Sequence, residues 1–202
     1  MADDVRTRTA RGAVGTQDPE QWLELGKRQA QFLRQNGLER HHRILEIGCG
    51  NLRAGWRFIR YLEPGNYVGI DISPDILLAA QETVVQRKLQ EKRPTVMLVK
   101  GTGLAALPSN WFDVAHAHSV FSHTPLEVIE SYLRDMKRVL KPDGFFDFTY
   151  NRTDGDTWDF LEEDYYFSLE RLTEVAALHG WDVRPMPGWK HKQDKVRLTH
   201  AG

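Results

Sequence analysis

The chain has a single cysteine, no excess of charge of either sign and no long apolar run, and each absence excludes a class of protein. Because Cys49 is the only cysteine among 202 residues, an internal disulfide is impossible. The 27 Lys and Arg residues nearly balance the 28 Asp and Glu residues, so no overall field would attract nucleic acid or an acidic membrane surface. No stretch reaches the roughly 18 consecutive apolar residues of a membrane helix. We therefore expect a small-molecule partner, and neither nucleic acid nor a membrane.

The beginning of the sequence lacks the apolar segment of a signal peptide, which favours a cytoplasmic location. Basic residues among Gly, Ala and Thr at positions 1–17 are typical of a disordered arm, with contact to a phosphate or a substrate as the alternative. Residues 18–202 suit one domain, since a chain of this size can bury a core of its own. The sequence leaves both a monomer and a homodimer open.

Short apolar runs alternate with helical patterns along most of the chain. The runs expected to form strands are RILEI, YVGID, TVMLV, FDVAHA, FFDFTY, WDVRP and KVRLTHA. Helical patterns follow Asp18, Leu52, Pro74, Leu126 and Ser168. This order predicts an α/β fold with a doubly wound, mostly parallel, seven-stranded sheet and an antiparallel last strand. In such a sheet, ligands bind outside the carboxyl ends of the strands.

One segment, residues 152–167, interrupts this alternation with a mixture of acidic and aromatic side chains. We interpret it as an insertion that covers the substrate site, with Trp158, Tyr165 and Tyr166 against the substrate. Its acidic residues favour a planar or amine-bearing substrate over a polyphosphate. The alternative is a solvated acidic loop whose aromatic rings close the edge of the core.

A glycine turn after the first strand has the composition of a nucleotide-binding loop. Gly48 and Gly50 let the backbone turn tightly and approach a ligand closely. Asp71 ends the next strand, at the distance where a carboxylate meets the ribose hydroxyls, although it could instead cap the helix at Pro74. A dinucleotide fingerprint would require glycine where Arg53 stands, which argues against a nicotinamide or flavin enzyme.

Four motifs in sequence order resemble the class I S-adenosylmethionine-dependent methyltransferases. They are EIGCG at 46–50, GIDIS around Asp71, FDVAHAHSVFSHTP at 112–125 and RVLKPDGFF at 138–146. The resemblance implies a Rossmann-like fold, S-adenosylmethionine as methyl donor and S-adenosylhomocysteine as product. It implies that Glu46 orients the cofactor's amino group and that Asp71 accepts from both ribose hydroxyls. The implied cofactor residues are Glu46, Gly48, Cys49, Gly50, Asp71, Ile72, Thr102, Gly103, Leu104, Ala117 and His118.

The chain departs from that family pattern at two positions. Leu52 stands where many relatives carry a third glycine, which alters the turn around the cofactor's carboxylate. Thr102 stands where many carry Asp or Glu after the third strand, which removes the usual side-chain acceptor for the adenine amino group. These departures leave room for a non-catalytic protein that retains the fold, and a nucleotide-dependent oxidoreductase is the other alternative.

Histidines near the end of the fourth strand are the candidate catalytic residues. Methyl transfer from a sulfonium needs mainly an aligned acceptor in a dry pocket, and a base only where the acceptor is a neutral hydroxyl. His118 is the first candidate base and His123 the second, while His116 is more simply a structural residue. Without a cysteine pair, these histidines do not predict a metal site.

Overall fold

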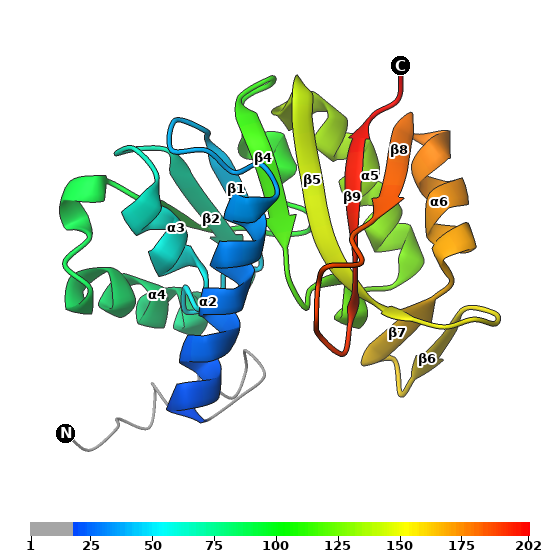
Figure 1. Cartoon of the computed structure of the whole chain (residues 1–202), viewed down its shortest axis with the longest axis horizontal. Coiled ribbons are helices and arrows are strands. Elements are labelled where there is room, and N and C mark those ends of the chain that lie inside the picture. Colours follow the sequence, from blue (N-terminus) through cyan, green and yellow to red (C-terminus); the bar gives the residue numbers. More distant parts are fainter. Residues whose placement is uncertain (1–17) are drawn as a thin grey trace. The chain divides into compact units, whose positions relative to one another are not determined.

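A computed structural model of the chain describes residues 18–202, which divide into two units between residues 100 and 101 (Figure 1). The basic arm predicted at residues 1–17 lies outside the described residues. Across residues 18–202, no helix combines the length and the apolar character needed to cross a bilayer.

The first unit contains three parallel strands in the order β3-β2-β1. They are β1 (Ile44–Ile47), β2 (Tyr67–Asp71) and β3 (Thr95–Leu98). The helices are α2 (Pro19–Gln35), α3 (Gly55–Tyr61) and α4 (Pro74–Gln86), with a short 3-10 turn, η1 (Gln90–Lys92). Because Ile47 lies opposite Ile70 and Asp71 opposite Leu98, the carboxyl ends of all three strands share one edge.

Local capping explains where the helices of the first unit begin. Asp18 accepts a hydrogen bond of 2.8 Å from Glu20 N, as predicted for the start of α2. Helix α3 begins at Gly55, later than the predicted pattern from Leu52, because the backbone first completes a turn. Gly26 lets α2 lie directly on that turn, since an added Cβ would stand 2.0 Å from Arg53 O.

The second unit contains six strands and two helices (Figure 1). The strands are β4 (Phe112–Ala117), β5 (Leu140–Arg152), β6 (Trp158–Phe160), β7 (Asp164–Phe167), β8 (Trp181–Pro185) and β9 (Asp194–His200). The helices are α5 (Leu126–Val139) and α6 (Leu169–Leu178), with 3-10 turns η2 (Leu104–Ala106) and η3 (Phe121–His123). Strand β4 runs parallel to β5, whereas β9 runs antiparallel to both β5 and β8. The predicted antiparallel last strand is therefore confirmed.

The segment at 152–167 folds as a hairpin attached to the end of β5. Strands β6 and β7 pair antiparallel, and β7 continues alongside β5 with Asn151 opposite Tyr166 and Arg152 opposite Phe167. Strand β5 begins before the predicted run FFDFTY and includes KPDG, residues 141–144, as a break in register where the partner on β5 changes from Leu140 to Phe145. Apart from the hairpin, seven strands of the described chain remain, as predicted.

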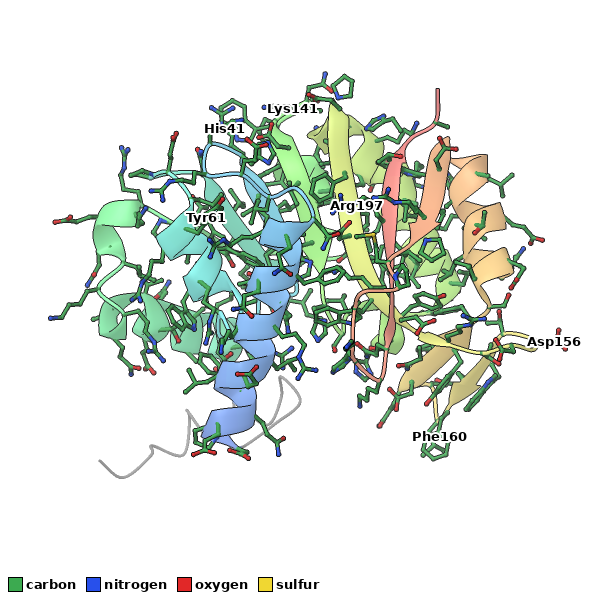
Figure 2. The ribbon with its side chains drawn as sticks, in the orientation of Figure 1. His41, Tyr61, Lys141, Asp156, Phe160 and Arg197 are labelled. Atoms are coloured by element: carbon green, nitrogen blue, oxygen red, sulfur yellow. The ribbon has the colours of Figure 1, made fainter. Side chains whose placement is uncertain are left out.

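The two faces of β5 differ in character, and this difference positions the polar residues of the second unit. Phe146 and Phe148 pack their rings against Phe121 on one face. On the other face, Asp147 is fully buried and accepts two hydrogen bonds, of 2.7 and 2.9 Å, from Arg197 of β9 (Figure 2). Lys195, two residues earlier on β9, is also buried, and burial lowers the pKa of its ammonium group to about 8.

Candidate functional site

Asp71 joins the two turns that follow β1 and β2. Its Oδ2 accepts a hydrogen bond of 2.9 Å from Gly50 N, and its Oδ1 accepts one of 3.0 Å from Ser73 N. Ser73, and not Asp71, caps α4, because its hydroxyl accepts from Ile76 N. A carboxylate offers about four acceptor positions, so Asp71 keeps the capacity to accept two further donors.

The turn predicted at Gly48 and Gly50 takes the backbone conformation that favours glycine. The φ angles are 62° at Gly48 and 55° at Gly50. Leu52 repeats this left-handed conformation with a φ of 65°, although its side chain is fully buried. A non-glycine residue in this conformation costs roughly 1–2 kcal/mol. The chain therefore keeps the backbone of a third glycine while filling the space beside it with a leucine.

Glu46 is buried beneath this turn and is held by Tyr67. The Tyr67 hydroxyl donates a short hydrogen bond to Glu46 Oε2, while Gly55 and Gly69 leave room for the pair. Burial raises the pKa of Glu46 to about 7, against the opposing effects of the Tyr67 hydrogen bond and the charge of Arg53. Sequence reasoning did not find Tyr67, because a tyrosine in a buried strand gives no sign of which acid its hydroxyl meets.

Two further residues support the glycine turn. The indole of Trp22 donates a hydrogen bond of 3.0 Å to Asn51 Oδ1, and the Thr83 hydroxyl donates one of 3.0 Å to the Asn51 carbonyl. Trp22 of α2 is therefore both buried and bonded to the turn. Cys49 packs against Gly69, and burial raises the pKa of its thiol, so it lacks the thiolate character of a reactive cysteine.

In the second unit, the predicted adenine segment after β3 forms a turn with two left-handed glycines. The φ angles are 58° at Gly101 and 69° at Gly103. Thr102, between them, donates a hydrogen bond to Asp135 of α5. Leu104 is buried at the start of η2, and its carbonyl accepts a hydrogen bond of 2.6 Å from Arg138.

The end of β4 carries Ala117 and His118, both buried. The His118 ring lies 5.5 Å from that of Trp189 and 5.1 Å from that of His191, between centroids. Trp189 and His191 both belong to the connection between β8 and β9. No motif in the sequence marks this connection as part of a site, and only its run of Trp, His and Gln could have drawn attention to it. His116 lies two residues earlier, within β4, with its Nδ1 3.5 Å from Lys195 Nζ.

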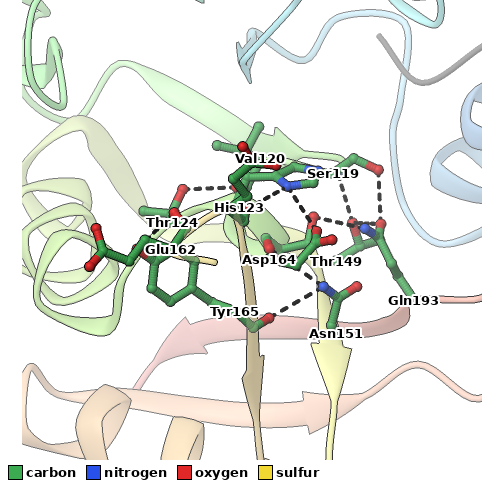
Figure 3. Close-up of polar contacts among 12 residues, drawn as sticks. Ser119, Val120, His123, Thr124, Thr149, Asn151, Glu162, Asp164, Tyr165 and Gln193 are labelled. Atoms are coloured by element: carbon green, nitrogen blue, oxygen red, sulfur yellow. Dashed lines mark hydrogen bonds and ion pairs between the residues drawn. The ribbon is translucent and has the colours of Figure 1, made fainter. Parts of the chain in front are cut away.

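A hydrogen-bond network fixes the backbone just beyond β4 (Figure 3). Ser119 has a left-handed φ of 56°, and its N–H donates a hydrogen bond of 2.9 Å to the Thr149 hydroxyl. The Gln193 Oε1 atom accepts hydrogen bonds from the hydroxyls of Ser119 and Thr149. Its Nε2 atom donates a hydrogen bond of 2.8 Å to the hydroxyl of Ser122. Strained backbone of this kind persists where surrounding contacts over-determine it, and it is frequent at functional sites.

His123 connects this region to the hairpin at 152–167. Its Nδ1 lies 3.0 Å from Asp164 Oδ1 and 3.0 Å from the Glu163 carbonyl oxygen. Figure 3 shows His123 beside Asp164. Two acceptors beside Nδ1 favour the tautomer that is protonated there, and in that tautomer Nε2 is an acceptor.

Three residues are predicted to contact the methyl acceptor, and the structure brings two of them together. Trp158 and Tyr166 stack with centroids 4.0 Å apart and an interplanar angle of 3°. Tyr165 alternates to the other face of β7, where its hydroxyl donates to the Glu162 carbonyl. Phe160, near the tip of the hairpin, is 57% exposed and projects outward (Figure 2).

Comparison with known proteins identifies the family. Residues 45–146, half of the chain, match the family described as a methyltransferase domain. A probable methyltransferase of Aspergillus luteorubrus is 30% identical over 64% of this chain and 45% of its own length. An uncharacterized methyltransferase of Schizosaccharomyces pombe is 29% identical over 51% of this chain and 37% of its own. The chain thus spans less than half the length of these relatives.

A solved structure extends the likeness to almost the whole chain. The magnesium protoporphyrin IX methyltransferase of Synechocystis, with bound S-adenosylmethionine, covers 97% of this chain and 90% of its own with a TM-score of 0.69 and 15% identity. At that identity the likeness shows the fold. The chain belongs to the methyltransferase domain family, and its α/β fold is the Rossmann-like fold of the class I methyltransferases.

The left-handed backbone at Leu52 makes a prediction about stability. Leu52→Ala loses the buried side chain and keeps the strain, whereas Leu52→Gly loses the side chain and relieves the strain. We expect both variants to be less stable than the parent, with the glycine variant more stable than the alanine variant by about 1 kcal/mol. Urea unfolding of the two variants measures the difference, and an alanine variant of equal or greater stability would contradict the prediction.

The environment of Glu46 makes a prediction about pH. Its pKa rises from 4.5 to about 7 on folding, so the folded state retains a proton that the unfolded state has lost. This contribution to stability is complete below about pH 4.5 and disappears as the pH rises through 7. Relative to Glu46→Gln, which cannot ionise, the parent should lose about 3 kcal/mol between these limits. Urea unfolding of the parent and the variant at matched pH values measures this loss. If the free energy of unfolding of both proteins depends on pH in the same way, the prediction is refuted.

Proposed function

We propose that this chain transfers the methyl group of S-adenosylmethionine to a small organic acceptor. The observation that carries the proposal is the position of Asp71, whose carboxylate joins the glycine turn to the end of β2 and can still accept from two donors. Two vicinal ribose hydroxyls are a pair of donors of that kind. Membership of the methyltransferase family and the cofactor in the Synechocystis neighbour's structure support the proposal.

The first unit supplies contacts for the methionine and ribose parts of the cofactor. Residues 48–50 would pass beneath the methionine end, with Glu46 orienting its amino group from below. Ile72 follows Asp71 and is 70% exposed, an unusual state for an isoleucine, and its side chain offers an apolar surface to the adenine ring. In the second unit, Thr102, Gly103 and Leu104 would contact the adenine, and Ala117 and His118 the side of the sulfonium.

Acceptors that are neutral hydroxyls would lose their proton to a histidine. The sulfonium supplies an electrophilic methyl group, so the chain's own residues need to orient the acceptor, exclude water and remove a proton. His123 fits the last role because Asp164 holds its Nδ1 proton and leaves Nε2 to accept another. His118 lies buried against two other rings and would instead orient the acceptor or serve as the second base.

The hairpin at 152–167 supports an acceptor of small size and flat shape. The stacked rings of Trp158 and Tyr166 present an aromatic surface, and the acids around them disfavour phosphate. A catalytically silent protein with the same fold is the alternative, and Leu52 and Thr102 are the departures that favour it. Binding of the cofactor product separates the two proposals.

The first test concerns the cofactor site. Calorimetric titration should detect binding of S-adenosylhomocysteine to the parent, and Asp71→Ala should weaken it by about 10-fold or more, since charged hydrogen bonds are lost. Asp75→Ala, which removes an exposed acid four residues later, serves as the matched control and should bind like the parent. Absence of binding by the parent at millimolar ligand would favour the silent scaffold and defeat the proposal.

The second test concerns the acceptor and its base. We expect methyl transfer to catechol-like hydroxyl or amine acceptors and little to their phosphorylated analogues. His123→Gln should lower kcat for a hydroxyl acceptor about 100-fold and leave an amine acceptor that is already neutral nearly unaffected. His41→Gln, at an exposed histidine of the first unit, is the control. A preference for phosphorylated acceptors, or equal loss with both acceptor types, would contradict this assignment.

A further inference from the structure

Three arginine side chains of the first unit lie over the same indole ring. The guanidinium carbon of Arg57 stands 4.1 Å from the centroid of the Trp56 ring. Those of Arg87 and Arg60 stand 4.5 and 4.9 Å from the same ring. Trp56, Arg57 and Arg60 belong to α3, whereas Arg87 is the C-cap residue of α4. The fold therefore gathers positive charges that come from two separate helices.

The three charges are close enough to repel one another. An aromatic ring attracts cations to its two faces, so a third guanidinium group at the same ring is unusual. Any two of the guanidinium carbons lie closer together than the Debye length of about 10 Å at 0.1 M salt, so salt screens their repulsion only in part. Burial lowers the pKa of Arg57 to about 10, and the charges of Arg87 and Arg60 act in the same direction.

No acid of the described chain pairs with these arginines. Between residues 18 and 202, no carboxylate oxygen lies within 4 Å of their guanidinium nitrogens. The charge of Glu24 does act on Arg57, but the carboxylate of Glu24 pairs with Lys27 at 3.7 Å. The positive charge of the cluster is therefore left without a direct counter-charge from the described residues.

Most N–H groups of the three guanidinium groups remain available to a ligand. Arg57 donates hydrogen bonds to the backbone carbonyls of Arg53, at 3.2 Å, and Leu23, at 2.8 Å. Arg60 donates one of 3.5 Å to the carbonyl of Arg87. Because a guanidinium group carries five N–H donors, each arginine keeps more than half of its donors. Arg60 is exposed, and Arg57 and Arg87 are partly exposed, so a solute can reach these donors.

The indole of Trp56 adds a further unused donor. Trp56 is only 8% exposed, and its Nε1 has no hydrogen-bond partner among residues 18–202. A buried donor without an acceptor is unfavourable. The cluster thus combines excess positive charge with unused N–H groups, and an oxyanion would supply both the missing charge and the missing acceptors.

The arrangement of the cluster favours one kind of anion. Guanidinium groups bind phosphate oxygens through pairs of parallel hydrogen bonds. Three positive charges around one ring favour an oxyanion with two or more negative charges over a carboxylate with one. A nucleic acid would require a more extended basic surface, whereas the whole chain has a net charge of −1. The structure therefore favours a phosphate group on a small molecule.

Helix α4 separates this cluster from the candidate cofactor site. The helix begins at Pro74, close to Asp71, and Arg87 caps its other end. With a rise of 1.5 Å for each of its 13 residues, its two ends lie roughly 20 Å apart. A ligand held by Arg87 would thus occupy a different place from one held by Asp71.

We propose that Arg57, Arg60 and Arg87 form a second ligand site, which binds a small molecule through a phosphate or pyrophosphate group. The bound group lies between arginines from α3 and α4, so it also stabilises the contact between these two helices. The proposal does not depend on the identity of the methyl donor or the acceptor.

The experiment uses sodium pyrophosphate and inorganic phosphate as probes, titrated by calorimetry into the full chain at constant ionic strength. We expect one pyrophosphate to bind per chain, more tightly than phosphate, while sodium acetate gives no heat beyond dilution. Arg57→Gln and Arg87→Gln should each weaken pyrophosphate binding about 10-fold or more, because each removes charged hydrogen bonds to the oxyanion.

Two controls show whether the effect is confined to the cluster. Arg171→Gln makes the same change of charge at an exposed arginine that already pairs with Glu174 at 3.2 Å, and it should bind pyrophosphate like the parent. Arg87→Gln should keep the parent's affinity for S-adenosylhomocysteine, because the two sites are separate. Thermal unfolding of each variant establishes that it is folded at the titration temperature.

Three results would overturn the proposal. The first is no binding of pyrophosphate by the parent, including the case in which a single-stranded oligonucleotide binds instead. The second is an equal affinity for pyrophosphate in the parent, Arg57→Gln and Arg87→Gln. The third is a loss of affinity for S-adenosylhomocysteine in Arg87→Gln that matches the loss for pyrophosphate, since the arginines would then belong to the cofactor site. A parent that binds pyrophosphate but not S-adenosylhomocysteine would contradict the proposed function alone.

Discussion

Asp71 accepts hydrogen bonds from two backbone N–H groups, and the rest of the first unit's candidate site depends on this interaction. One oxygen holds the turn after β1 and the other holds the turn after β2, so a single carboxylate sets the separation of two loops. The buried Glu46 and Tyr67 pair supports the glycine turn from below. A site built in this way is arranged before any ligand arrives, which reduces the entropy lost on binding.

Much of the fold was predictable because it follows from patterns a few residues long. Strands β2 and β4 begin and end where their apolar runs do, and Asp18 and Ser168 cap the helices that they precede. The misplaced boundaries have local causes. Helix α3 starts late because Leu52 has a left-handed backbone, and β5 runs through KPDG because a register break absorbs the turn. Neither cause is visible in periodicity.

The glycine turn and Asp71 of the candidate site could be predicted, because residue type and spacing along the sequence are enough to identify them. The contacts that support these residues were not, because they join positions far apart in the sequence. Gln193 meets Ser122 across 71 residues, and Asp135 meets Thr102 across 33. The sequence shows which groups are present, and the fold determines which of them meet.

The hairpin between β5 and α6 leaves the end of β5 and returns to pair with that same end. Arg152 and Phe167 are register partners, and Thr153 N donates to the Phe167 carbonyl at 3.1 Å. The ends of the intervening segment are therefore already closed, and doubling its length would cost only about 0.6 kcal/mol in chain entropy. The length and sequence of this segment can therefore change at little cost to the rest of the second unit.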